Sequence, residues 1–418
     1  MSLWIHDLRL FLRERQALPI LLLMLALSAA SVWAGMAEVS HQRAVIDRIQ
    51  PQQAADVAAV AAGAAKDGDP GNAAYYTAHA TWDAPSSLAF AALGQRDVAP
   101  YVLRVRALAL EGQIHESENY NAELALPGRF DWAFVLTYLA PLFMIVLLHD
   151  LVSGEREAGR DVLLGVMARS SRSLWLRRSA IRAGLLFAAL VLPFAAGCVL
   201  SRSGPAAWLA IGCAAAYLLL WTLLCLAASM MRFGSVANAA GLAALWLVIT
   251  LILPALALLA VNAAVPVRQG VELTLAQREA VHAGWDKPKE ATMQAFFRQH
   301  PEWRATAPIA GGFHWKWYYA FQHLGDLSVA EQSRSYRTGL EARDAWTRRI
   351  GMVLPTVGVQ VALHRLARTD LAAQLAYSDR IRAYHARLRR FYYPYLFDAR
   401  PFTQQDFGKA PRWNGEDE

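Results

Sequence analysis

The stretch Val236–Val265, VANAAGLAALWLVITLILPALALLAVNAAV, decides the fold class of this chain. It contains no Asp, Glu, Lys, Arg or His over its whole length. A helix of about 20 apolar residues crosses the roughly 30 Å hydrocarbon layer of a bilayer, so this run predicts a membrane span. Four more runs have the same character: Ala17–Gly35, Trp132–Leu148, Ala183–Leu200 and Ala206–Met230. The sequence therefore predicts an all-α, polytopic membrane protein with five transmembrane helices.

Two long polar regions accompany these spans. Residues 36–131 lie between the first two runs, and residues 266–418 follow the last one. A shorter basic loop, residues 149–182, joins the second and third spans. We expect both long regions to be mainly helical, because alanine-rich and amphipathic stretches dominate them.

Local signals refine this expectation. Pro51 predicts an interruption in the first polar region, and the residues around Tyr101–Leu110 allow short strands. In the second region, Asp326 is a predicted N-cap for the helical stretch that follows it, and Thr369–Phe391 predicts another helix.

Basic residues of the short flanks indicate the orientation. Three arginines lie in residues 1–16, seven lie in the loop 149–182, and Arg232 lies in the turn between the fourth and fifth spans. Short basic flanks remain in the cytoplasm. We therefore expect a multi-pass protein of the bacterial inner membrane, with a cytoplasmic amino terminus and both long polar regions outside. Arg202, in a short outer turn, is the one exception.

Two segments allow alternative interpretations. The pattern up to Ala34 resembles a cleaved signal peptide, but Trp4, Ile5 and Phe11 share a helical face, which favours an interfacial amphipathic helix over residues 1–16 and a retained first span. Gly351–Ala367 is at the lower length limit for a sixth span and contains several polar residues. We expect it to be a buried or surface-lying helix and leave the sixth span open.

Several functional classes are disfavoured by absences in the sequence. The spans carry no ionisable group, which argues against ion-driven transport, and the chain has no GxxxxGK[ST] nucleotide loop. No hydrolase motif, zinc-finger spacing or basic nucleic-acid motif is present, although the net charge is +7. The three cysteines lie in apolar runs, and the spacing of the histidines predicts no metal site.

Small residues are frequent in the last three spans and let helix backbones approach closely in lipid. They are consistent either with packing inside the bundle or with a seam between two subunits of a dimer. For such a seam the candidate residues are Gly212, Asn238 and Gly241.

The cytoplasmic loop opens with GEREAG (154–159), a charged stretch that directly follows a span. The segment FDWAFVLTYLAPLFMIVLLHDLVSGEREAGRDVLLGVMARSSRSLWLRRSAIRAG resembles the ABC-2 type permeases, in which a span ends at an acidic residue before an E-R-E-x-G-T-L-x-L-L-like element. Arg160 and Asp161 depart from the usual Thr-Leu. The matching residues are Asp150, Glu155, Arg156, Glu157, Gly159, Leu163, Leu164 and Arg178.

The outer regions resemble the subgroup of these permeases that carries a DUF3526 domain. The segment LHRLARTDLAAQLAYSDRIRAYHARLRRFYYPYLF is similar to its later outer region. Permeases of this kind usually have six spans, whereas five are found here. In the first outer region the matches are Gly94, Gln95, Arg96, Asp97, Gly128, Phe130 and Asp131.

The resemblance implies a non-catalytic permease subunit that exports a substrate, paired with itself or a related permease. A separate ATPase dimer would bind ATP and Mg²⁺, so no cofactor is expected in this chain. The coupling residues would be the matching residues from Asp150 to Leu164, with Glu155 and Glu157 facing basic groups of the ATPase. The alternative is a mechanical transducer that drives an outer partner without transport. The aromatic segment HWKWYYAFQH (314–323) would be a lid, a partner patch or an interfacial belt.

Overall fold

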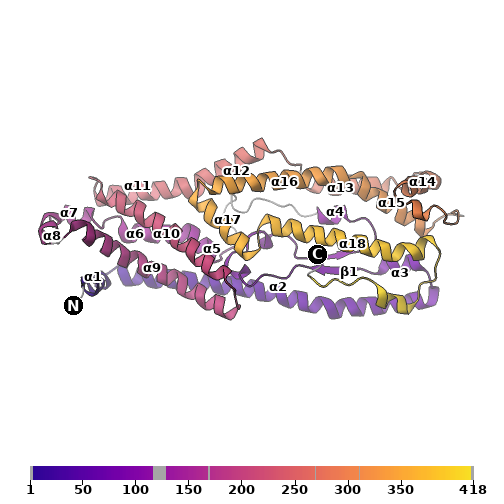
Figure 1. Cartoon of the computed structure of the whole chain (residues 1–418), viewed down its shortest axis with the longest axis horizontal. Helices are drawn as coiled ribbons and strands as arrows, with labels where there is room; N and C mark the ends of the chain where they lie inside the picture. The colour runs from indigo at the N-terminus through magenta and orange to yellow at the C-terminus, as the bar shows by residue number, and fades with distance from the viewer. Residues whose placement is uncertain (1–2, 116–128, 168–169, 269, 310, 416–418) are drawn as a thin grey trace.

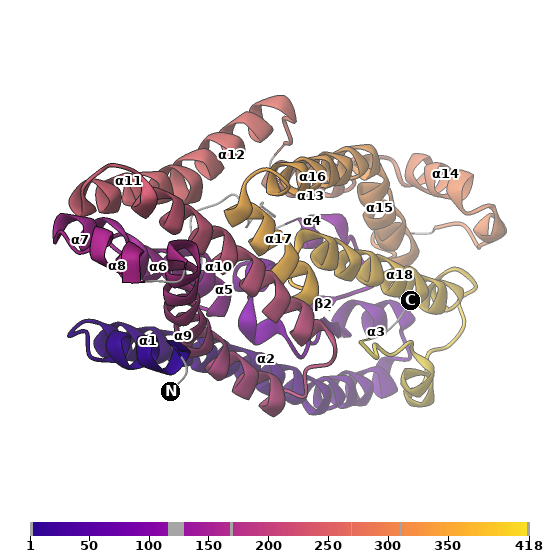
Figure 2. The same ribbon diagram turned by 60° about the vertical axis from the view of Figure 1, so that its left-hand side comes forward.

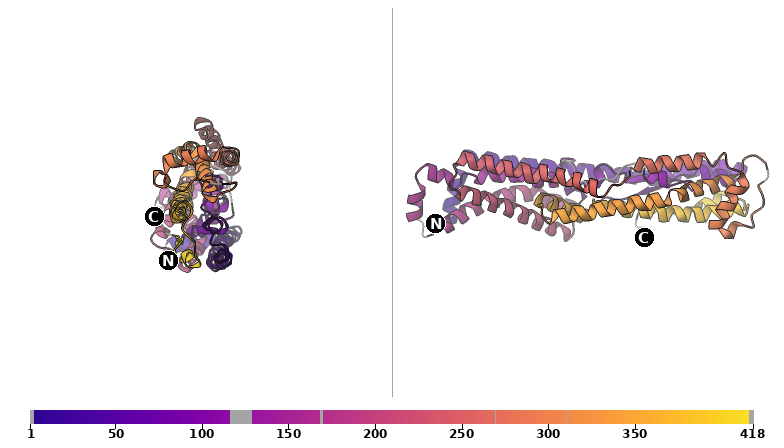
Figure 3. Two further views of the ribbon diagram at one scale, coloured as in Figure 1. Left: turned by 90° about the vertical axis from the view of Figure 1, so that its right-hand side faces the viewer. Right: turned by 90° about the horizontal axis from the view of Figure 1, so that it is seen from above.

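A single helix, α2 (Ala17–Asp67), runs along most of the rod-shaped molecule (Figure 1; Figure 3). The computed structural model describes residues 3–115, 129–167, 170–268, 270–309 and 311–415. With 51 residues, α2 is about 75 Å long. The predicted interruption at Pro51 was wrong, because the helix continues through this residue. A proline removes one backbone hydrogen bond, and the alanine-rich turns that follow it favour helix strongly enough to continue.

Five helices in the described part of the chain are long and apolar enough to cross a membrane, which confirms the all-α, polytopic membrane class. Two of them contain a short π-helical segment. The third begins well before the predicted Ala183, because the basic residues that precede it are also helical. The spans are formed by the first part of α2, by α5 (Trp132–Phe134), η3 (Val135–Leu139) and α6 (Ala140–Leu148), by α9 (Ser171–Leu200), by α10 (Ala206–Met230), and by α11 (Ser235–Leu247), η4 (Val248–Ile252) and α12 (Leu253–Ala264).

Side chains of the first two spans donate hydrogen bonds to one backbone carbonyl of the third span. The Ser28 hydroxyl of α2 donates to the Leu190 carbonyl of α9 at 2.6 Å, and the indole nitrogen of Trp132 donates to the same oxygen at 3.2 Å. The Trp132 ring also stacks on Phe194, with 4.1 Å between ring centroids. These contacts join the first three spans near the end of the bundle from which the polar regions extend.

The open question of a sixth span is answered by α17 (Pro355–Ala367), which has 13 residues. At 1.5 Å per residue it extends only about 20 Å, and it is not among the five candidate spans of the described chain. It follows α16 (Ala330–Gly351) and packs against α10 and the two π-helical segments (Figure 2). Val357 is fully buried in a cluster with Val261 of α12. The buried-helix interpretation of this segment is therefore confirmed.

The remaining elements form a distal domain at the end of the rod opposite α1 (Leu3–Leu12) (Figure 1). Its core is dense in aromatic side chains, with Tyr319, Tyr384, Tyr392 and Phe296 almost completely buried. The short helix η1 (Ala89–Ala91) packs into the core of the span bundle. The distal domain consists of the second half of α2, α3 (Pro70–Tyr76), β1 (His79–Trp82), η2 (Gly94–Asp97), β2 (Val102–Val105), α4 (Glu111–Ile114), α13 (Gly270–His282), α14 (Lys289–Gln299), η5 (Pro301–Trp303), α15 (Trp315–Ser328), α16, α18 (Leu371–Phe397) and η6 (Gln404–Lys409).

The two strands form an antiparallel pair, with His79 opposite Val105 and Trp82 opposite Val102. This confirms the short strand expected near Tyr101–Leu110. The helix expected at Thr369–Phe391 is also present as α18, which extends further to Phe397.

The GQRD segment joins the two polar regions of the sequence into this one domain. The backbone amide of Gln95 donates to the Thr369 carbonyl at 2.8 Å. At Gly94 the backbone has a φ of +49°, and a Cβ atom there would lie 2.5 Å from the same carbonyl. Arg96 is buried and pairs with Asp83 at 2.5 Å. A glycine at position 94 thus permits both the left-handed backbone and the close approach.

The predicted role of Asp326 was wrong. Asp326 lies inside α15, and α16 begins at Ala330 after Val329 as its N-cap. The Asp326 carboxylate instead accepts from the backbone amides of Leu110 and Glu111, at 2.8 and 3.1 Å, and so caps α4 from a distant part of the chain.

Candidate functional site

The GEREAG stretch forms α7 (Ser153–Glu157) and the turn into α8 (Asp161–Met167). Both helices lie at the same end of the molecule as α1, opposite the distal domain (Figure 1). The turn depends on Gly159, whose φ of +67° lies in the left-handed region. A residue with a Cβ atom would be strained in this position, which accounts physically for the glycine between the two helices.

Two charged side chains of α7 bind the turn between α10 and α11. Arg156 donates through Nη2 to the carbonyls of Met231 and Phe233, at 2.7 and 2.8 Å. The Glu157 carboxylate accepts from the amide and the hydroxyl of Ser235, at 2.6 and 2.9 Å. Glu157 thereby caps the first turn of α11, where a negative charge is favourable. The end of one span is thus attached to the ends of two others.

The third charged side chain of α7, Glu155, connects this helix to α9. Its carboxylate accepts from Arg160 Nε at 2.6 Å and from Arg178 Nη1 of α9 at 3.3 Å. Arg178 also lies 3.7 Å from the carboxylate of Asp7, which forms a closer ion pair with Arg177. Asp7 is buried, so its charge is screened little by solvent. An ionic chain therefore runs from α7 through α9 to α1.

A second contact ties the turn between α1 and α2 to the same place. Arg182 of α9 donates to the Leu147 carbonyl at 2.7 Å and to the Glu14 carboxylate at 2.6 Å. A cavity of about 220 Å³, lined by Glu14, Glu155, Arg178 and α1 residues, lies between these groups. Burial raises the pKa of Glu14 above its usual value.

The surface of α8 has a different character. Val162, Leu163, Val166 and Met167 are exposed to 73%, 60%, 81% and 76% of their surface, and no residue of α8 is buried. Only Leu164 packs against the core of the bundle. Four neighbouring apolar side chains are therefore left uncovered by the rest of the described chain, next to the charged residues of α7. We call these four residues the α8 patch.

The predicted coupling residues consequently have different environments. Asp150 is exposed, and its carbonyl accepts from the Gly154 amide at 2.7 Å. Glu155 and Glu157 are held by partners within the chain, and the expectation that they face an ATPase stays a prediction. Of the two leucines, Leu163 points outward and Leu164 inward. Sequence reasoning did not single out Val162, Val166 or Ser235, although the spacing of four residues between the two valines would place them on one face of a helix.

The three predicted seam residues also separate into two groups. A Cβ atom added at Gly212 or Gly241 would meet nothing within 4 Å among the described residues, so both face an open surface of the bundle. Asn238 is buried and donates to the His149 carbonyl at 3.4 Å. The seam remains a prediction for the glycines, whereas Asn238 packs within its own chain.

A polar cluster lies inside the bundle where α17 meets the two π-helical segments. The Tyr217 hydroxyl donates to the Thr137 carbonyl at 2.9 Å, and Gln360 Nε2 donates to the Tyr138 hydroxyl at 2.9 Å. The Thr250 and Thr356 hydroxyls lie near the Tyr217 hydroxyl. Unpaired polar groups in a membrane bundle are costly. Within the described chain, the atoms with no hydrogen-bond partner here are the Oγ1 atoms of Thr137, Thr250 and Thr356 and Oε1 of Gln360.

We expect Thr137→Val to stabilise the protein by about 1 kcal/mol, because an apolar group of the same shape replaces a buried, unpaired hydroxyl. Thermal unfolding of the purified protein in detergent measures this as a higher midpoint. Thr222→Val is the matched control, since its hydroxyl already donates to the Leu218 carbonyl at 2.7 Å. If the Thr137 replacement lowered the midpoint as the control does, the Thr137 hydroxyl would be paired.

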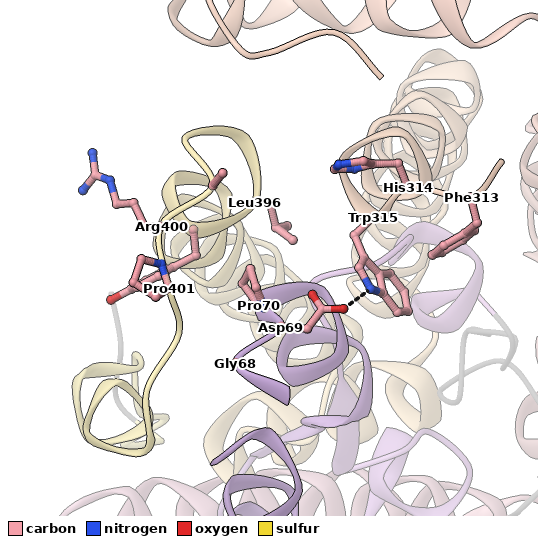
Figure 4. A pocket seen from close by; sticks show the side chains of 11 residues that line it. Gly68, Asp69, Pro70, Phe313, His314, Trp315, Leu396, Arg400 and Pro401 are labelled. Atoms are coloured by element: carbon pink, nitrogen blue, oxygen red, sulfur yellow. Dashed lines mark hydrogen bonds between the residues drawn. The ribbon is translucent and has the colours of Figure 1, made fainter. Parts of the chain in front are cut away.

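The aromatic segment 314–323 lies in α15, far from the spans (Figure 1). This position does not fit an aromatic belt at the headgroups. Trp317 and Tyr319 are buried in the distal core. The Trp315 indole donates to Asp69 at 2.8 Å beside a hollow of about 480 Å³ that Phe313 and Arg400 also line (Figure 4). Most of the segment therefore builds the distal core.

Comparison with known proteins identifies one domain. Residues 271–415, from α13 to η6, match the family model described as a domain of unknown function, DUF3526. This confirms the resemblance for the second polar region. No curated protein and no solved structure matches the chain.

Proposed function

We propose that this chain is the membrane-spanning, non-catalytic subunit of an ABC-2 type transporter, and that a separate ATPase dimer binds it at α7 and α8. The observation that carries the proposal is the α8 patch. Exposed clusters of apolar side chains bounded by polar residues mark sites of protein association. Here the patch is attached to α7, whose charged side chains connect it to four other helices, so a force applied to α8 reaches the spans.

The proposal places α1, α7 and α8 in the cytoplasm. The arginines of residues 1–16 and 149–182 support this orientation, because short basic flanks are retained on the inner side of a bacterial membrane. The distal domain, which includes the DUF3526 region, is then extracytoplasmic.

Movement of α8 has two routes into the spans. Arg156 and Glu157 transmit it to the turn that joins α10 and α11, and Glu155 transmits it through Arg178 to α9 and α1. ATP and Mg²⁺ belong to the partner, since this chain has no nucleotide loop in its sequence. We expect export of a substrate by a dimer of this chain or by a pair with a related permease.

A mechanical transducer is the second candidate, and α2 favours it. This one helix extends from the α1 end through the bundle and along the distal domain (Figure 3). A rigid element of this length carries movement from the membrane to an outer partner without a substrate path.

Co-expression with an ATPase encoded beside this chain tests the proposal. We expect the two proteins to co-purify, and the hydrolysis rate of the ATPase in liposomes to rise when this chain is present. Failure to associate would contradict both candidates. Hydrolysis accompanied by vectorial transport supports the transporter, whereas hydrolysis that depends on an outer partner and moves no substrate supports the transducer.

A further inference from the structure

Two histidines that the sequence places 23 positions apart face each other in the distal domain. His300 follows α14 and His323 lies in α15, and their Nε2 atoms are 3.3 Å apart. Both residues line a cavity of about 440 Å³. The His300 ring stacks on Phe296, with 4.8 Å between centroids, so packing holds the imidazole in this position.

The other nitrogen of each ring also has a partner. His300 Nδ1 lies 2.9 Å from the Glu302 carboxylate, and His323 Nδ1 lies 3.1 Å from the Tyr393 hydroxyl. Metal-binding histidines show this arrangement, because a hydrogen bond from Nδ1 fixes the tautomer and directs the Nε2 lone pair at the metal. With both Nδ1 atoms protonated, both Nε2 lone pairs point into the same space.

The separation between these nitrogens suits a shared ion. Two imidazole nitrogens, each about 2.0–2.1 Å from a tetrahedral Zn²⁺, lie about 3.3 Å apart. Among the described residues no group of three or more His, Cys, Asp and Glu side chains is placed to hold a metal. The pair therefore supplies two ligands, and the other coordination positions open into the cavity.

Charges around the cavity allow a cation. Three carboxylates and three arginines line the cavity, and two of these arginines are paired, Arg382 with Glu111 at 2.7 Å and Arg389 with Asp326 at 2.6 Å.

We propose that His300 and His323 form a transition-metal site of the Zn²⁺ class, open to the cavity of the distal domain. Imidazole nitrogen suits Zn²⁺, Cu²⁺ and Ni²⁺, and two protein ligands with open positions make a site that exchanges its ion readily. The site does not depend on an ATPase partner.

The test is calorimetric titration of the purified full chain, with any affinity tag removed, using Zn²⁺ as the probe. We expect one ion per chain and a higher unfolding temperature in the presence of Zn²⁺. His323→Ala should weaken binding by at least about tenfold, and Glu302→Ala, which removes a partner of Nδ1, by about tenfold. Co²⁺ in place of Zn²⁺ should give the visible absorption of a tetrahedral site.

His282→Ala is the matched control, because His282 is exposed in the same domain and should leave Zn²⁺ binding unchanged. Two outcomes would overturn the proposal. The first is the absence of Zn²⁺ binding to the folded chain, in which case the two rings form a neutral hydrogen-bonded pair. The second is binding that His300→Ala and His323→Ala do not weaken, which would be an adventitious ion only.

Discussion

In the proposed complex, replacing Val162 and Val166 with aspartate should separate this chain from the ATPase. These side chains are 73% and 81% exposed and have no role in the core, so the folded protein should tolerate both changes. At a protein interface, two charges in an apolar contact cost at least about 2 kcal/mol, or roughly thirty-fold in affinity. Pull-down of the co-expressed ATPase measures the loss.

The matched control is Leu275→Asp, which changes a side chain of similar exposure on α13 of the distal domain. This variant should retain the ATPase fully. Equal retention of the ATPase by the Val162→Asp, Val166→Asp variant would exclude α8 as the binding surface.

The double variant Glu155→Ala, Glu157→Ala should have the opposite phenotype. It removes the contacts of α7 with Arg178, Arg160 and Ser235, while the α8 patch remains intact. We expect the ATPase still to bind and the stimulation of its hydrolysis by this chain to fall strongly, because α7 loses its ion pair with α9 and its contact with the first turn of α11, and only Arg156 still joins it to the turn between α10 and α11. Steady-state hydrolysis in nanodiscs, together with pull-down, separates the two effects.

Glu331→Ala serves as the control for this variant, since Glu331 forms an ion pair on the exposed face of α16 and should affect neither measurement. Normal stimulation in the α7 variant would contradict a transmitting role for α7. Loss of binding together with stimulation would instead support the direct contact with the ATPase that the sequence suggests for the two glutamates.

The spans were the most predictable part of the fold, because a long apolar run without charges has few alternatives to a membrane helix. Their ends were less predictable. The helix of the third span begins at Ser171 rather than near Ala183. The arginine-containing segment in front of the apolar run is also helical, so the end of the apolar run does not mark the end of the helix. At Pro51 the prediction placed a helix end where none exists. The proline alone predicts a break, but the helix-forming residues around it continue the helix.

Pairings between distant residues could not be predicted from one sequence. Asp7 and Arg178, Glu157 and Ser235, and His300 and His323 meet only because helices from different parts of the chain pack together. The GEREAG stretch is informative about where the site lies, and the tertiary structure determines what each charge binds. Asp326 is a further example, because its carboxylate caps α4, which is distant in the sequence, and not the helix that follows it.

Site-specific photo-cross-linking from position 166 tests the central claim most directly. A photoreactive residue replaces Val166, and the chain is irradiated in membranes that contain the ATPase. We predict a covalent adduct with the ATPase from position 166 and none from position 275, which is also exposed but lies in the distal domain. An ATPase that co-purifies with the chain but gives no adduct from position 166 would contradict the claim that α8 is its binding surface.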